Sequence, residues 1–263
     1  MRSTLYILFL LVIISTSCEE IIDVDLSDSE PVLVSEALIL KDSVCKVNLS
    51  YTYSYFDPSA SPAEENAEIL LSDDAGRSEM LYHQGGGYYK GNTLTGDEGR
   101  TYTIGINIEG REYSGSAELN RKPEIIGLDY EILSIPHNTD TDPVYSVKTV
   151  FKDRPDEDNY YLFRYYRNNE MINDYFSTYG DQLLRADTLT FSDFRMDFYR
   201  KDTVRVELYA IDEALYNYFS RLNDVLFSAM SSSTPYNPQY GFSEDIMGYF
   251  MAASFDSHTI IIQ

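Results

Sequence analysis

The sequence predicts a mainly β protein of two β-rich modules, the second of which carries one amphipathic helix. Short apolar segments recur at intervals of roughly 8–15 residues, and turn-forming residues separate them, a pattern typical of β-sandwiches. Helical spacing of apolar residues stands out in one long segment, at about 212–230. A chain of 263 residues is long enough for two modules of ordinary domain size.

The first module is expected to be a β-sandwich at residues 31–122. Its clearest strand is 101–108, in which Tyr102 and every second residue after it are apolar and alternate with mostly polar neighbours. Glu109-Gly110 then predicts a two-residue turn into the next strand, and Asp73-Asp74-Ala75-Gly76 predicts another turn. The remaining strands of this module are expected at 32–40, 44–51, 68–72 and 111–119.

The second module is expected at residues 123–263. Asn168-Asn169 predicts a hairpin turn between strands at 160–167 and 171–176, and the segment 177–200 is expected to be irregular. We expect the last strand of the chain to belong to this module. Its other strands are expected at 144–151, 203–210, 246–253 and 259–262.

The helix is predicted from its cap and its apolar stripe. Asp212 is a good N-cap, and Glu213 follows in the first turn. The stripe is interpreted as a face packed on the sheet, with a partner-binding groove as the alternative. It consists of Leu215, Tyr218, Phe219, Leu222, Val225, Leu226 and Ala229.

Composition excludes several classes of protein. The chain has 43 acidic residues against 20 Lys and Arg, a net charge of −23 that would repel a phosphate backbone, so no nucleic-acid partner is expected. An apolar content of 43% is too high for a disordered chain. Two cysteines cannot build a disulfide framework.

The N-terminus resembles a lipoprotein signal peptide at residues 1–17. Arg2 precedes an apolar run that is about half as long as a membrane span, and small residues lead to Cys18. We expect Cys18 to be lipidated, although Ser15 stands where lipoboxes usually carry Leu. An ordinary secretory signal with an incidental cysteine is the alternative. Residues 18–30 are rich in acids and are expected to form a tether.

The search for chemistry predicts a protein that is not an enzyme and has no catalytic residues or cofactors. His83, His137 and His258 lack partners at metal-ligand spacing, and neither HExxH, CxxC nor GxSxG occurs. A hydrolase based on a carboxylate pair stays open, because sequence does not fix spatial separation. Gly85-Gly86-Gly87 lies between strands and lacks the residues of a phosphate-binding loop. Cys45 is interpreted as a buried thiol, with a reactive one as the alternative.

Two acidic loops are weak candidates for calcium binding. Asp140 and Asp142 offer alternating oxygens, as do the acids of 153–158, but solvated surface loops are the simpler interpretation and no metal site is predicted. Two tyrosine clusters are interpreted as sheet packing, with a binding patch as the alternative. They comprise Tyr51, Tyr53 and Tyr55, and Tyr160, Tyr161, Tyr165 and Tyr166.

Several segments in order resemble the domain-of-unknown-function 4249 (DUF4249) family of Bacteroidota outer-membrane lipoproteins. The segments are Cys18-Glu19-Glu20, Asp23-Val24-Asp25-Leu26, 67–71, Asp73-Asp74-Ala75-Gly76, Gly99-Arg100-Thr101-Tyr102-Thr103-Ile104, Gly110-Arg111-Glu112-Tyr113, Ile211-Asp212, Tyr216-Asn217-Tyr218-Phe219, Asn237-Pro238 and Gly248-Tyr249-Phe250. The resemblance implies an N-terminal immunoglobulin-like or carboxypeptidase-regulatory-like sandwich, and it brings no catalytic residues.

The expected function follows from the lipidated Cys18 and from this resemblance. We expect a lipid-anchored protein at the cell surface of the outer membrane, accessory to a TonB-dependent, SusC-like transporter in ligand capture or uptake. A cell-surface adhesin or glycan-binding module is the alternative. The sequence identifies neither the ligand nor the partner.

Overall fold

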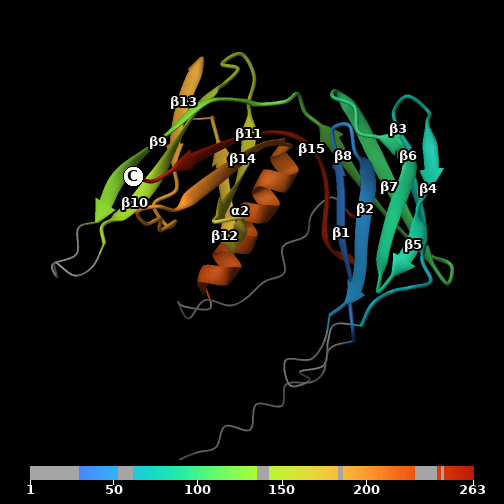
Figure 1. Ribbon diagram of the computed structural model, residues 1–263. Helices are drawn as coiled ribbons and strands as arrows, with labels where there is room; N and C mark the ends of the chain where they lie inside the picture. The colour runs from blue at the N-terminus through green and yellow to red at the C-terminus, as the bar shows by residue number, and fades with distance from the viewer. Residues whose placement is uncertain (1–29, 53–61, 135–141, 183–185, 229–241, 244–245) are drawn as a thin grey trace, which may run out of the picture. The chain divides into compact units, whose positions relative to one another are not determined.

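The computed structural model describes residues 30–52, 62–134, 142–182, 186–228, 242–243 and 246–263, which form fifteen strands and one helix (Figure 1). The helix is α2 (Glu213–Ser228). The strands are β1 (Leu33–Leu40), β2 (Val44–Tyr51), β3 (Glu68–Asp73), β4 (Ser78–Met80), β5 (Tyr82–Gly85), β6 (Tyr88–Thr95), β7 (Arg100–Ile108), β8 (Arg111–Leu119), β9 (Glu124–Ser134), β10 (Val144–Lys152), β11 (Tyr160–Arg167), β12 (Glu170–Gly180), β13 (Thr188–Ser192), β14 (Thr203–Ile211) and β15 (Ile246–Ile261).

The strands form three sheets, which confirms the predicted mainly β fold with one helix in the described residues. One sheet has eight strands in the order β12-β11-β14-β15-β1-β2-β6-β5. A second has the order β4-β3-β7-β8, and a third the order β13-β10-β9. Among the described residues, no helix is both long and apolar enough to cross a membrane.

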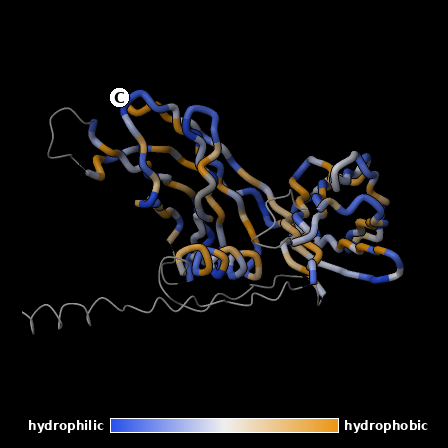
Figure 2. Tube along the Cα trace, turned by 90° about the horizontal axis from the view of Figure 1, so that it is seen from below, coloured by the Kyte–Doolittle hydropathy of each residue, from blue (hydrophilic) through white to orange (hydrophobic). Residues whose placement is uncertain are grey.

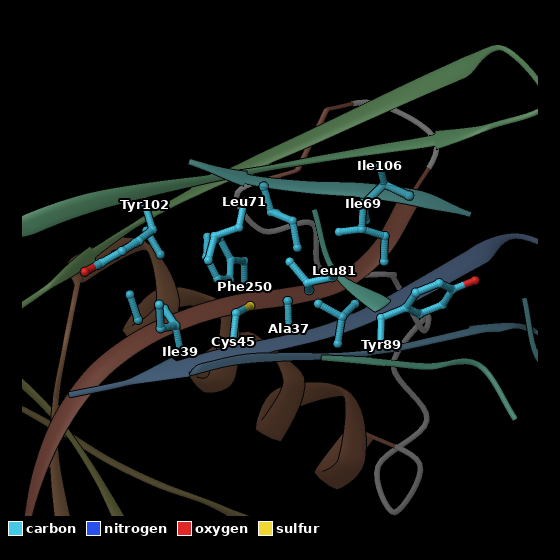
Figure 3. Close-up of a cluster of buried hydrophobic side chains, with 14 of the residues drawn as sticks. Ala37, Ile39, Cys45, Ile69, Leu71, Leu81, Tyr89, Tyr102, Ile106 and Phe250 are labelled. Carbon is cyan, nitrogen blue, oxygen red and sulfur yellow. The ribbon is translucent and has the colours of Figure 1, made fainter. Parts of the chain in front are cut away.

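The four-stranded sheet packs against the β1-β2-β6 part of the large sheet. Apolar side chains from both layers meet between them in one buried cluster, part of which Figure 3 shows. Tyr102, Ile104 and Ile106 are at most 1% exposed, as the alternation along 101–108 predicts. The tube in Figure 2 changes repeatedly between hydrophobic and hydrophilic along the strands, as expected for strands with one buried and one solvated face.

The second half of the chain also forms a layered structure. The three-stranded sheet packs on one face of β11 and β14, around aromatic residues such as Phe151, Phe163 and Phe198. The other face of these strands packs against α2, through residues such as Leu162 and Phe219. The sheet is therefore covered on both faces in this half, and its strands contain long apolar runs for that reason.

The C-terminal strand differs from the prediction. Residues 246–253 and 259–262 were expected to be two strands of the second module, but β15 is continuous from Ile246 to Ile261. Its first half pairs in parallel with β1, and its second half pairs antiparallel with β14. The polar residues between the expected strands do not break β15 because they have partners: Ser254 donates to the carbonyl of Asn120, and Asp256 binds Lys122.

Both predicted hairpin turns are confirmed. The two residues of each turn, Glu109-Gly110 and Asn168-Asn169, have positive φ, as two-residue turns with this twist require. The expectation for 177–200 is wrong in part, since β12 extends to Gly180 and β13 occupies Thr188–Ser192. Three of the four residues at 177–180 are small or polar, so the sequence does not indicate a strand there. The strand forms because these residues pair with Tyr160–Phe163. The strands β4, β5 and β6 were not predicted. β4 and β5 are short and mostly exposed, and β6 buries only Tyr89, Gly91 and Leu94 in an irregular pattern.

The helix begins as predicted, with Asp212 Oδ1 accepting a hydrogen bond from the Leu215 amide at 2.7 Å. The apolar stripe is buried at its start but not at its end, because Leu226 is 45% exposed. Asn223 is buried instead. Its side chain accepts from the Phe176 amide at 2.9 Å and donates to the Phe176 carbonyl at 2.6 Å, so it binds β12 as a neighbouring strand would. Ala229 lies outside the described residues.

Candidate functional site

The expected lipidation site lies outside the described residues. Cys18 and residues 19–29 precede Glu30, the first residue that is described. Lipidation of Cys18 and the tether therefore stay predictions. The described residues form a polar cleft and a hollow on the four-stranded sheet.

The calcium candidates are only partly described. Asp140 lies outside the described residues, and Asp142 is exposed. Asp153 is buried and accepts a hydrogen bond from the Tyr161 hydroxyl at 2.8 Å. Within the part of the chain that is described, no three His, Cys, Asp or Glu side chains gather in a way that could hold a metal ion.

A buried polar cluster lies where β10 and β12 end and β11 begins. The amide and the side chain of Asn159 both donate to Asp181, at 2.8 and 2.9 Å. Burial and the neighbouring carboxylate of Asp181 raise the pKa of Asp153. Sequence reasoning missed Asp181, because only folding brings it beside Asp153.

A polar cleft of about 370 Å³ opens beside this cluster. It lies where the end of β8 meets the start of β11 and the first residues of α2. The N-terminal end of the helix adds a partial positive charge to the cleft. Most of its lining is polar. The lining residues are Gly99, Glu118, Asn120, Arg121, Arg154, Glu157, Asp158, Asn159, Tyr160, Tyr161, Ala210, Ile211, Asp212 and Glu213.

The charges of the cleft are mixed. Arg154 is held by Glu157 at 2.6 Å, while Arg121 is exposed. The Tyr160 hydroxyl accepts a hydrogen bond from Gln182 at 2.8 Å. A cleft of this kind can bind a small polar ligand by hydrogen bonds and charge.

A second hollow, of about 530 Å³, lies on the four-stranded sheet. We call it the sheet groove. Leu70 and Met80 give it an apolar side, and they are 44% and 45% exposed. Ser114 and Ser243 form the other side, with Gly105 between. This groove was not predicted, because Ser243 reaches the sheet from a distant part of the chain.

The tyrosine clusters serve mainly in packing where they are described. Tyr160, Tyr161 and Tyr165 are at most 8% exposed, which confirms the packing interpretation for these three. Tyr166 is partly exposed and lies under the guanidinium of Arg205, 3.6 Å from the ring centre. Tyr53 and Tyr55 lie outside the described residues.

The Cys45 thiol is confirmed to be buried. Its side chain is fully buried among apolar side chains of the first sandwich, and burial raises the pKa of the thiol to about 12. A protonated, buried thiol is a poor nucleophile. This cysteine therefore contributes to the core.

Comparisons with known proteins identify one family. The profile of a family described as a domain of unknown function, DUF4249, matches residues 19–259. No curated protein matches the chain. Among solved structures, a pullulanase of Anoxybacillus sp. LM18-11 in complex with maltotriose is similar at 15% identity and a TM-score of 0.21. The match covers 79% of this chain and 27% of the pullulanase, and it carries no argument about fold or activity.

Proposed function

Because the chain belongs to the DUF4249 family, we propose that it is a non-enzymatic lipoprotein, anchored by Cys18 in the outer membrane of a member of the Bacteroidota and exposed at the cell surface. There it assists a TonB-dependent, SusC-like transporter in the capture or uptake of a ligand. The observation that carries the proposal is the order of features along the chain: a lipobox-like Cys18, an acidic segment, and then a β-rich unit that starts at Pro31.

The acidic segment is suited to a tether. Residues 19–32 separate Cys18 from β1, and a fully extended chain of that length reaches at most about 50 Å. This reach would place the β-rich unit beside a membrane-embedded partner. A second acyl chain would make the attachment stable, since one chain alone binds a bilayer only marginally.

The β-rich unit offers two surfaces for binding. The polar cleft beside the start of α2 suits a small polar ligand, and the sheet groove suits a protein side chain. Both surfaces are lined in part by residues of paired strands.

The proposal is tested in two steps with the native lipoprotein. First, cells are labelled with radioactive palmitate. The wild-type chain is expected to carry the label and to fractionate with the outer membrane, and the Cys18→Ala variant is expected to lose both properties. A wild-type chain that stays unlabelled would show that Cys18 is incidental.

Second, the tagged lipoprotein is purified from solubilised outer membranes. Co-purification of a TonB-dependent barrel is expected, and it should decrease with the Cys18→Ala variant. Repeated recovery without any barrel would count against an accessory role. Binding of the purified protein to a glycan array without a partner would instead support an adhesin or glycan-binding module.

A further inference from the structure

The sheet groove is built by strand register on the solvent face of the four-stranded sheet. Leu70 pairs with Met80 on one side and with Gly105 on the other, and Gly105 pairs with Ser114. This row of four residues therefore crosses the sheet from edge to edge. Leu70 and Met80 lie at one end of the row and Ser114 at the other. Gly105, which has no side chain, lies between them.

Ser114 and Ser243 form one wall of the sheet groove, and hydrogen bonds between them hold Ser243 in place although it is distant in the sequence. The Ser243 amide donates to the Ser114 carbonyl at 2.8 Å, and the Ser114 amide donates to the Ser243 hydroxyl at 3.0 Å. Next to it, Phe242 pairs with Gly115 and packs against the core. These contacts fix the wall before anything binds, which lowers the entropic cost of binding.

Nothing inside the described structure requires a glycine at position 105. Its φ is not positive, and a Cβ added there would meet only the Leu70 carbonyl oxygen, at 4.0 Å. A glycine within a strand weakens the strand, and it often marks a place where a ligand or another backbone approaches closely. The open space over Gly105 is the feature that such an approach would use.

The next row of the sheet carries two carboxylates. Asn107 pairs with Glu68 on one side and with Glu112 on the other. Both glutamates are exposed, and among the described residues neither takes part in an ion pair. The groove thus combines exposed apolar side chains with unpaired negative charges at its border.

We propose that the sheet groove binds an extended segment of a partner protein that carries an apolar side chain and, two residues away on the same face of the segment, a lysine or arginine. The apolar side chain packs on Leu70 and Met80, the segment's backbone passes over Gly105, and the basic side chain lies between Glu68 and Glu112. The inference rests on the proposed function only in taking a protein as the partner.

The test measures binding of a fluorescent seven-residue peptide, Val-Ser-Lys-Ser-Val-Ser-Lys, to the lipoprotein in non-ionic detergent, by anisotropy. Its valines and lysines lie two residues apart and therefore share one face of the extended chain. The central variant is Gly105→Thr, which fills the groove at a position where the fold has room for a side chain. Gly127→Thr is the matched control, since Gly127 also lies in a strand, β9, with nothing within 4 Å of an added Cβ.

The expected result is saturable binding that Gly105→Thr weakens at least tenfold and Gly127→Thr changes less than twofold. The double variant Glu68→Lys, Glu112→Lys should also weaken binding at least tenfold, and the same peptide with glutamate in place of both lysines should not bind wild type. Equal weakening by both threonine variants, or no weakening by either, would overturn the proposal. Either result would mean that the peptide binds through general attraction to an acidic protein and not through the groove.

Absence of binding at millimolar peptide would overturn it as well. The peptide measurement involves no transporter and no outer membrane. Its result is therefore independent of whether a barrel co-purifies with the lipoprotein.

Discussion

Gly248 is the glycine whose replacement should damage the fold most directly. It lies near the start of β15 with φ of +104°, opposite Ser35 in the parallel pairing with β1. A Cβ added there would lie 1.9 Å from the Ser35 carbonyl oxygen and 2.8 Å from its carbonyl carbon. Both atoms are backbone, so the two strands must move apart to accept even an alanine.

The cost of Gly248→Ala can be worked from these contacts. An alanine held at this φ costs about 1–3 kcal/mol in backbone strain. Separation of the strands weakens one or two ladder hydrogen bonds, each worth about 1 kcal/mol net. Together we expect the free energy of unfolding to fall by about 2–5 kcal/mol, which is a large share of the roughly 5–15 kcal/mol typical of a folded protein.

The assay is equilibrium unfolding in urea followed by circular dichroism. Gly105→Ala is the control, because its Cβ has room, and it should be neutral or stabilising by up to about 1 kcal/mol. A loss below about 1 kcal/mol for Gly248→Ala would refute the reasoning. It would mean that β1 and β15 are not as closely paired at Ser35 as described.

Three further outcomes are expected. Asn223→Ala should lower the free energy of unfolding by about 2–4 kcal/mol in the same urea assay, because it leaves the Phe176 amide and carbonyl without their partner; a loss under 1 kcal/mol would contradict this. Alkylation of Cys45, followed by peptide mass mapping, should proceed only as fast as the protein opens, because its thiol is buried with a pKa of about 12; rapid labelling of folded protein would show an exposed thiol. The raised pKa of Asp153 implies that its protonated form stabilises the fold at low pH and that this contribution is lost as the pH rises through the folded-state pKa. Asp153→Asn should therefore be more stable relative to wild type at pH 8 than at pH 4, with a gain of about 1 kcal/mol from an amide that can donate to Asp181; an equal difference at both pH values would argue against the carboxylate pair.

The parts of the fold that sequence predicted are those with a local cause. Alternation along 101–108, the turn at Glu109-Gly110 and the N-cap Asp212 each depend on neighbouring residues, and each is confirmed. The continuity of β15 was missed because its middle residues are polar. Their partners, such as Asn120, lie far away in the sequence.

The binding surfaces were beyond sequence reasoning for the same physical reason. No local pattern around Gly105 predicts a groove. Only the pairing of β3, β7 and β8 places this glycine between Leu70 and Ser114. Ser243 joins them through a contact that no periodicity encodes. The predicted lipidation of Cys18 rests on a local signal instead, the apolar run and the small residues that precede it in the sequence.

The pairing of β1 with β15 has a consequence for folding during synthesis, because β1 is made before its partner. β1 (Leu33–Leu40) leaves the ribosome well before Ile246 and the residues that follow it, because they lie far apart in the sequence. Until then β1 has only β2 as a neighbour, and its other edge can pair with foreign strands. A chain cut short before Ile246 would therefore be an unfinished sheet with an adhesive edge, and such fragments should depend on chaperones or be degraded.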